Sequence, residues 1–222
     1  MVGRSLTERP WRDVRWLVLA PHPDDETLGA GALIHQAAGL DRLAALVYLT
    51  DGSGSHENAR GLAAVRRREA ALALFRLTGR RLPRPIHLDW KDADPKIPSS
   101  SEFARSVAFL DSLCRRLRVG AIAVTASHEP HCDHSAAARL AHAVQANARG
   151  RLRLAEYCVW SAPPSERSHI RLKTSPMSAG RRRQALRAHR SQLTTSCGPG
   201  FRLPADRQRM PACDTLFLRR PR

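Results

Sequence analysis

The sequence contains no apolar run that approaches the roughly 20 residues needed for a membrane-spanning helix. Its five cysteines are an odd number and include no C-x-x-C pair, which excludes a disulfide framework and a structural zinc knuckle. Aromatic residues make up only 5% of the chain, so a long stacking groove for a polysaccharide is not expected. Lysine is scarcer still, because only Lys91, Lys96 and Lys173 occur among 37 lysines and arginines.

The arginines give the chain a formal net charge of +17. Such a charge suits a nucleic acid, an anionic membrane surface or a phosphorylated substrate. The competing interpretation is that the arginine bias reflects the nucleotide composition of the genome, since the arginines are spread along the chain. Charge alone specifies no binding site, so a nucleic-acid partner is the less favoured interpretation.

The amino-terminal residues are charged and form no apolar signal core before the first predicted strand, so a cytoplasmic protein is expected. A chain of 222 residues is long enough for one domain with a substantial core and short for two. No repeat or linker divides it. A single domain over residues 1–222 is therefore predicted, with its core at about 14–160 and with 161–222 completing it.

Apolar runs rich in β-formers alternate with amphipathic helical patterns along most of the chain. This order favours an α/β fold, an open and mostly parallel sheet with helices on both faces. The predicted strands lie at 15–20, 43–50, 85–88, 119–125, 152–160, 170–174 and 215–218. The predicted helices lie at 27–38, 59–77, 103–117, 135–148 and 179–193.

Two clusters of histidine and carboxylate residues follow predicted strands. Residues 20–27 read APHPDDET and come directly after the first strand. Residues 128–134 read HEPHCDH and follow the strand at 119–125. In open α/β sheets, sites form outside the carboxyl ends of the strands. The two clusters can meet only if their strands lie close together in the sheet, which the sequence alone does not determine.

The clusters hold the side chains of a metal site. Two histidines and one carboxylate are a common catalytic zinc arrangement with one position open for water. His22 and Asp25 can supply two ligands, a histidine of the second cluster the third, and a remaining carboxylate can act as general base. This inventory fits attack of water on an amide or ester carbonyl. The alternative, an aspartate that merely caps the next helix, explains one carboxylate but neither the histidine nor the second acid.

The first cluster resembles the signature of the LmbE-like, or PIG-L, family of zinc-dependent N-deacetylases, and residues 131–134 resemble the second motif of that family. The resemblance extends over most of the chain, since further matches follow in the same order. These are Thr50-Asp51-Gly52, the pair Arg66 and Glu69, Asp92, and the pattern of Ala185, His189, Ser191 and Gln192.

The resemblance implies a Rossmann-like fold with Zn²⁺ as the cofactor, although another divalent metal is possible. His22, Asp25 and His134 would bind the zinc ion. Asp24 would be the general base that deprotonates the metal-bound water. The segment 161–222 would complete the substrate side of the domain.

The resemblance also implies roles for residues around the metal ligands. His131, as an imidazolium, would stabilise the tetrahedral intermediate, with Asp133 orienting it and holding its charge. Arg66 and Asp92 would bind substrate, with sugar hydroxyls as the favoured partners. The plain alternative for this last pair is a surface ion pair of Arg66 with Glu69 and a solvated loop aspartate.

Two residues of the second cluster depart from the pattern or exceed it. Cys132 stands where the family usually has proline, and a buried small side chain is the favoured interpretation. His128 is an additional imidazole that can compete for the metal or face the substrate.

The expected activity is hydrolysis of an N-acyl group, most often N-acetyl in this family, from a small amino-sugar substrate such as an N-acetylglucosamine derivative. One alternative is an amidase that acts on a non-sugar or conjugate amide. An alternative of another class is a basic nucleic-acid-binding protein on a Rossmann-like scaffold, which gives no reason for the positions of His22, Asp24, Asp25 and His134.

Overall fold

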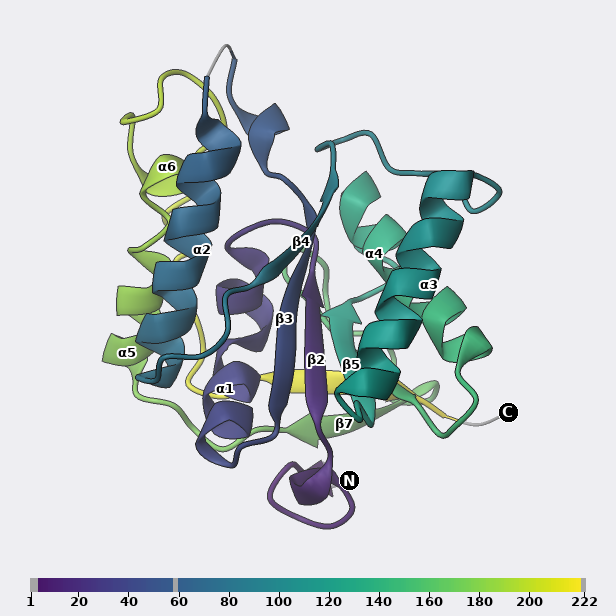
Figure 1. Ribbon diagram of the computed structural model, residues 1–222. Coiled ribbons are helices and arrows are strands. Elements are labelled where there is room, and N and C mark those ends of the chain that lie inside the picture. Colours follow the sequence, from purple (N-terminus) through teal and green to yellow (C-terminus); the bar gives the residue numbers. More distant parts are fainter. Residues whose placement is uncertain (1–3, 58–59, 221–222) are drawn as a thin grey trace.

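The computed structural model describes residues 4–57 and 60–220 of the chain, and Figure 1 shows their arrangement. An eight-stranded sheet runs in the order β1-β7-β8-β6-β5-β2-β3-β4. Every pairing is parallel except the two made by β8, which confirms the prediction of a mostly parallel sheet. The strands are β1 (Arg4–Ser5), β2 (Trp16–Ala20), β3 (Leu43–Thr50), β4 (Ile86–Trp90), β5 (Ala121–Thr125), β6 (Arg153–Tyr157), β7 (His169–Lys173) and β8 (Thr215–Arg219).

Helices cover both faces of the sheet (Figure 1). The helices α1, α2 and α5 pack on one face, and α3 and α4 pack on the other. Their bounds are α1 (Asp25–Gly39), α2 (Leu62–Thr78), α3 (Ser101–Arg116), α4 (Cys132–Asn147), α5 (Ala179–Leu186) and α6 (Arg190–Leu193). Among the described residues, no helix is both long enough and apolar enough to span a membrane.

The central strands are apolar on both sides because each face of the sheet carries helices. In β2, Val18 and Ala20 belong to the core beneath α1 and α2, whereas Leu17 and Leu19 belong to the core beneath α3 and α4. All four are fully buried. The near-continuous apolar runs in the sequence are therefore strands that lie between two layers of helices.

The structure differs from the predicted elements at two strands and at helix ends. The strand predicted at 152–160 is β6 and ends at Tyr157, and β1 was not predicted. The helix predicted at 59–77 begins at Leu62, and residue 59 lies outside the described part of the chain. The helix predicted at 179–193 is two helices. The helical conformation is interrupted between α5 and α6, with His189 directly before α6. His189 has a non-helical backbone there and directs Nε2 to Glu26 Oε1 at 3.0 Å. This tertiary contact replaces the helical continuation that the local sequence favours.

The position of β2 beside β5 brings the two clusters together. Trp16 to Leu19 pair in parallel with Ala121 to Val124, so both strands end at the same edge of the sheet. The chain proceeds from β2 to β3 and β4 on one side, and from β5 to β6 on the other. This reversal of strand order makes the crevice between the loops after β2 and β5 the expected ligand position of an open α/β sheet.

The segment after β6 is tied to α1 by a buried ion pair. Arg182 of α5 lies 2.7 Å from Asp214 Oδ1 through Nη1 and donates to the carbonyl oxygens of Thr27 and Leu28. Asp214 Oδ2 in turn accepts from the backbone N–H of Leu33. Because Thr27 and Leu28 lie in the first turns of α1, this pair anchors the helix that follows the first cluster.

We expect Arg182→Ala to lower the free energy of unfolding by about 3–5 kcal/mol, because it leaves the buried Asp214 carboxylate without its cation. Arg183→Ala is the matched control, since Arg183 is the exposed neighbour on the same helix and its loss should change stability by no more than about 0.5 kcal/mol. Urea denaturation of both variants measures the difference. Equal stability of the two variants would show that the buried pair does not anchor this segment.

Candidate active site

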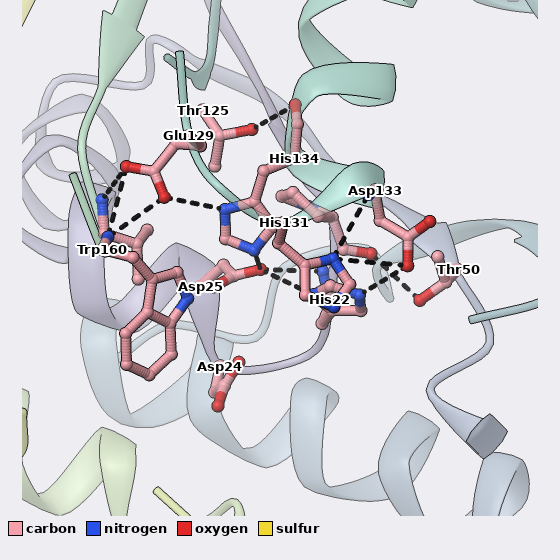
Figure 2. Close-up of polar contacts among 12 residues, drawn as sticks. His22, Asp24, Asp25, Thr50, Thr125, Glu129, His131, Asp133, His134 and Trp160 are labelled. Carbon is pink, nitrogen blue, oxygen red and sulfur yellow. Dashed lines mark hydrogen bonds and ion pairs between the residues drawn. The ribbon is translucent and has the colours of Figure 1, made fainter. Parts of the chain in front are cut away.

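Figure 2 shows that the residues of the two clusters meet, and the strands before them, β2 and β5, end at the same edge of the sheet. His22 and Asp25 come from the connection between β2 and α1, and His134 comes from the first turn of α4. Asp25 Oδ2 lies 3.1 Å from His22 Nδ1 and 3.2 Å from His134 Nε2. Two histidines from segments far apart in the sequence therefore share one carboxylate oxygen.

Each of these two histidines also contacts a second carboxylate through its other ring nitrogen. His22 Nε2 lies 3.0 Å from Asp133 Oδ2, and His134 Nδ1 lies 3.1 Å from Glu129 Oε2. Asp133 and Glu129 are buried, as are Asp25 and His134. A carboxylate behind each histidine is the usual means of fixing the tautomer and orientation of a metal ligand.

The donor set fits a small divalent cation. In a tetrahedral site with bonds of about 2.0–2.1 Å, neighbouring ligand atoms stand about 3.3–3.4 Å apart. The contacts of 3.1 and 3.2 Å at Asp25 are close to this separation. The ring nitrogens of His22, His131 and His134 also lie within 4.8 Å of one another, which places His131 beside the same point. Asp25 is the more central donor, because its oxygen is shared by His22 and His134.

The electrostatics of the cluster also favour a cation. Burial disfavours charged imidazoles, but the hydrogen bonds to Asp133 and Asp25 raise the pKa of His22 to about 10. For His134, burial is likewise outweighed by Asp25 and Glu129, which raise its pKa to about 9. The carboxylates thus hold protons on two ring nitrogens. A divalent cation that binds these nitrogens would displace a proton from each.

Asp24 lies beside the cluster and lines the same pocket, but its backbone conformation is unusual. Its φ of 131° is a value that residues with a side chain rarely adopt. The backbone N–H of Asp24 donates to Glu26 Oε2 at 2.9 Å, and Glu26 is held by His189. Burial, together with the charge of Asp25, raises the pKa of Asp24 to about 7. This carboxyl group can therefore exchange a proton near neutral pH.

The contacts of Glu26 and Glu69 explain two of the sequence matches near the carboxyl terminus, His189 and Ser191. Glu26 and His189 are both fully buried and form a pair beneath Asp24. Ser191 is also fully buried and donates to both carboxylate oxygens of Glu69, through its N–H at 2.9 Å and its hydroxyl at 2.6 Å. These residues support the site from below, and the alternative of a surface ion pair between Arg66 and Glu69 is wrong.

Arg66 and Asp92 lie together on the wall of the pocket. Arg66 is buried and donates from Nη2 to Ser55 Oγ at 2.7 Å, with Asp92 Oδ2 at 3.9 Å from its Nη1. Asp92 accepts from the backbone N–H groups of Gly52 and Gly54, so it is not an ordinary solvated aspartate. The structure thus brings both predicted substrate-binding residues to one pocket.

His131 and Asp133 are paired differently from the expectation that the resemblance gave. The Asp133 carboxylate contacts His22 and accepts from Ala93 N–H at 2.8 Å, whereas His131 Nδ1 is 3.8 Å from it. His131 is instead the cap of α4, where Nδ1 accepts from the backbone N–H of Asp133 at 3.2 Å. Burial and the nearby His22 and His134 lower the pKa of His131. This direction disfavours the imidazolium form that the resemblance implied for His131.

The structure also places Cys132 and His128 of the second cluster, and it corrects the expectation for Cys132. Cys132 is exposed rather than buried, because it occupies the first position of α4 and its side chain faces outward. His128 is also exposed, and its Nε2 lies 2.9 Å from the carbonyl oxygen of Ala162. That contact attaches His128 to the loop after β6.

The pocket above the cluster has a volume of about 650 Å³. Its floor is the histidine and aspartate cluster, and one wall carries Arg66 and Asp92. The opposite wall comes from later segments, with Trp160 from the loop after β6 and Phe201 and Arg207 from the chain before β8. The Arg207 guanidinium lies 5.3 Å from the Trp160 ring centroid, and the Phe201 ring stands edge-on at 6.4 Å.

Sequence reasoning missed Glu129 and the aromatic wall. Glu129 adjoins the recognised motif, but nothing in a single sequence indicates that its carboxylate turns inward to His134. Trp160 and Phe201 are isolated aromatics in loops of low regularity, and only the fold brings them to the same pocket. A signal existed for Gln192, which matched the carboxyl-terminal pattern and lines the pocket with a buried Oε1 that has no partner among the described residues.

The family of the chain follows from its sequence. Residues 17–145 match the PIG-L family, which is described as GlcNAc-PI de-N-acetylase. The match covers more than half of the chain and includes both loops of the cluster. This protein therefore belongs to the PIG-L family. No curated protein matches its sequence.

Solved structures of similar fold include several deacetylases. The N,N'-diacetylchitobiose deacetylase from Pyrococcus horikoshii has a TM-score of 0.63 at 21% identity, over 84% of this chain and 74% of that one. A conserved protein from Thermus thermophilus has a TM-score of 0.56 at 26% identity, over 84% and 82%. A zinc-inhibited form of teicoplanin deacetylase has a TM-score of 0.65 at 17% identity, over 93% and 98%.

Proposed function

We propose that this protein is a metal-dependent hydrolase that removes an N-acyl group, most simply acetyl, from an amino sugar such as an N-acetylglucosamine derivative. The observation that carries the proposal is the shared contact of Asp25 Oδ2 with His22 and His134, beside the carboxyl group of Asp24 in one pocket. Membership of the PIG-L family supports the reaction class. The deacetylases of similar fold, which act on chitobiose and teicoplanin compounds according to their names, support an amino-sugar substrate.

In this proposal His22, Asp25 and His134 hold Zn²⁺, although another divalent metal would fit the same donors. A bound zinc ion would polarise the amide carbonyl and make hydroxide available from water at neutral pH. Asp24 accepts the proton of the attacking water and returns it to the leaving amine. The carboxyl group of Asp24 lines the pocket, and Glu26, itself held by His189, accepts from the Asp24 N–H and holds this unusual backbone in place.

His131 is the proposed donor to the carbonyl oxygen as negative charge develops there. Its Nδ1 is occupied by the backbone N–H of Asp133, so its proton resides on Nε2, and the side chain lines the pocket. A positioned N–H of this kind stabilises a tetrahedral intermediate without being charged itself. The Asp133 carboxylate acts by orienting His22 rather than His131.

Arg66, Asp92 and Gln192 are the proposed contacts for the polar groups of the substrate. Arg66 Nε and Gln192 Oε1 are buried at the pocket and have no hydrogen-bond partner among the described residues. Buried polar atoms normally find partners, so these two atoms suit a ligand that offers both donors and acceptors. The hydroxyl groups of a sugar provide both.

A conjugate amide is the second candidate substrate, favoured by the wall that Trp160, Phe201 and Arg207 form. A pocket of 650 Å³ suits a drug-sized ligand rather than a single small sugar. Aromatic rings at its rim would contact an apolar or aromatic group attached to the acylated amine. Phe201 and Arg207 of this wall lie in the segment 161–222, so this segment forms part of the substrate side. We propose that residues 1–222 act as one domain and that the protein is cytoplasmic.

The test is release of acetate from N-acetylglucosamine derivatives in free, nucleotide-linked, lipid-linked and aryl-linked form, before and after removal of metal with a chelator. Metal-dependent release from any sugar derivative supports the proposal, and activity confined to non-sugar amides selects the conjugate amidase. Protein that contains no metal and binds DNA or RNA tightly, with a steep dependence on salt, would replace both with the nucleic-acid-binding alternative.

The rate should fall as the pH drops, because only the ionised form of Asp24 can accept a proton. Burial and the charge of Asp25 raise the pKa of this group to about 7, so its carboxylate is lost on the acidic side of neutrality. A bound divalent cation would lower the midpoint below that of the metal-free protein. Measurement of kcat/KM between about pH 5 and 9 reports this acidic limb. A rate that stays constant down to the acidic end would contradict the role of Asp24.

A further inference from the structure

Glu129 joins the metal-binding cluster to the aromatic wall of the pocket. It lies in the loop between β5 and α4, and only 4% of the residue is exposed. Its carboxylate reaches His134 on one side and the backbone of the loop after β6 on the other (Figure 2). Within residues 4–57 and 60–220, no other side chain of the cluster contacts both a proposed metal ligand and the segment that carries Trp160.

The loop side of this carboxylate consists entirely of hydrogen-bond donors. Oε1 accepts from the backbone N–H groups of Val159 at 2.9 Å and Ser161 at 3.0 Å, and from Ser161 Oγ at 2.6 Å. The N–H of Trp160 lies 3.0 Å from Oε2. A backbone N–H can only donate, so both oxygens must act as acceptors on this side.

The hydrogen-bond donors of the loop determine which ring nitrogen of His134 carries the proton. The four donors of the loop favour the ionised form of Glu129, which has no proton to give, so His134 Nδ1, at 3.1 Å from Oε2, is the donor. A neutral His134 then carries its proton on Nδ1 and presents the lone pair of Nε2 toward Asp25, 3.2 Å away. The tautomer that can bind a metal through Nε2 is thus imposed from the far side of the ring.

The same carboxylate fixes the position of the pocket wall. The three residues that it holds, 159–161, are consecutive and include Trp160 at their centre. Trp160 lines the pocket and contacts Arg207 and Phe201. Loss of the acceptors would leave three partly buried backbone donors unsatisfied, so the loop would have to move.

We propose that Glu129 is a positioning residue that sets the Nδ1–H tautomer of His134 for metal binding and, through the backbone of residues 159–161, holds Trp160 against the substrate. This inference rests on the metal site of the proposed function. It adds a residue that neither the recognised motifs nor the ligand set contains. It also gives the second cluster a side-chain link to the segment after β6.

Glu129→Gln is the sharpest test, because it keeps the shape of the side chain and removes one acceptor. If the amide nitrogen faces His134, the imidazole must carry its proton on Nε2 and cannot bind metal there. If the nitrogen faces the loop, it opposes backbone donors. We expect zinc affinity, measured by chelator competition, to fall by about 10–100-fold, as is typical when the partner of a metal-bound histidine is lost.

Glu156→Gln is the matched control. Glu156 is an equally buried glutamate, 2% exposed, in the neighbouring strand β6. Its carboxylate also lies near histidine, with His142 Nε2 at 3.6 Å, and its described ion pairs lie outside the cluster. Both variants neutralise a buried carboxylate and should lose stability, whereas only Glu129→Gln should lose zinc affinity. The rise in Tm that zinc causes within each variant separates the two effects.

Wild-type zinc affinity in Glu129→Gln would overturn the proposal and reduce Glu129 to a structural residue. A wild type without any zinc-dependent rise in Tm would overturn it as well. Nitrogen-15 NMR of the zinc-loaded wild type provides a measurement that needs no variant to fold. The expected result is a protonated Nδ1 on His134, and a protonated Nε2 would refute the assignment.

These readouts require no substrate. Failure to hydrolyse any sugar amide would therefore count against the proposed function and leave the zinc results unaffected. Conversely, active enzyme with a Glu129→Gln zinc affinity equal to that of wild type would refute only the role of Glu129. With an active substrate, KM tests whether Glu129 holds the loop that carries Trp160. The KM of Glu129→Gln should be higher than that of Glu156→Gln even at saturating zinc.

Discussion

Asp24→Asn should lower kcat by about 10²–10⁴-fold, the range that a positioned general base contributes. The amide cannot take a proton from water, while asparagine keeps the size of the side chain and is among the residues that tolerate a positive φ. Zinc content should stay at the wild-type level, because the contacts of Asp25 with His22 and His134 do not involve Asp24. The measurement is acetate release together with metal analysis of the same preparation.

The matched control for this variant is Asp41→Asn. Asp41 also has a positive φ, of 56°, but its side chain is exposed at the end of α1 and pairs with Arg80. It should retain wild-type activity. Asp24→Ala should lose turnover in the same way as Asp24→Asn. If either Asp24 variant released acetate at the wild-type rate, the assignment of the general base would be wrong.

His134→Ala should lose metal as well as activity. Removal of a direct donor should cost more zinc affinity than the ~10–100-fold typical for loss of an outer hydrogen-bonding partner. The substitution also leaves the buried Glu129 carboxylate without its imidazole partner, so a fall in stability is expected in the same variant. Metal analysis and chelator competition measure the first effect, and thermal unfolding without metal measures the second.

His128→Ala provides the comparison for this loss. His128 is an exposed histidine of the same cluster, and its contact is with a backbone carbonyl rather than with Asp25. Its removal should leave zinc content unchanged. Stoichiometric zinc in purified His134→Ala would show that the ion binds elsewhere, and the group of His22, Asp92 and Asp133 is then the next to test.

The strands and the two clusters could be predicted because the sequence patterns that indicate them lie within a few neighbouring residues. An apolar run bounded by polar residues predicts a buried strand, and β3 begins and ends at the predicted residues. The helices were predicted less accurately at their ends. The break at His189 depends on a contact with Glu26, a residue 163 positions away. No periodicity in residues 179–193 could reveal it.

The contacts within the site were harder to predict than its members. The resemblance placed Asp133 behind His131, whereas the carboxylate lies on His22. Both imidazoles are near Asp133, whose Oδ2 lies 3.0 Å from His22 Nε2 and 3.8 Å from His131 Nδ1. The loop geometry sets this small difference in distance, which decides which histidine is the partner. Cys132 was expected to be buried, but the first turn of α4 places it outside. Neither outcome has a signature in residue type or spacing.

The sequence by itself determined which residues are the candidates for the chemistry, because two histidine and carboxylate clusters after apolar runs are not explained by folding alone. It also determined the class of fold, because the hydrophobic periodicity that distinguishes strands from helices is a local property of the sequence. The tertiary structure alone decided that the clusters form one site, by placing β2 beside β5. It also decided that Glu129, the Glu26–His189 pair and Trp160 belong to that site. Strand order and side-chain direction arise from packing over long separations in the chain, and a single sequence records neither.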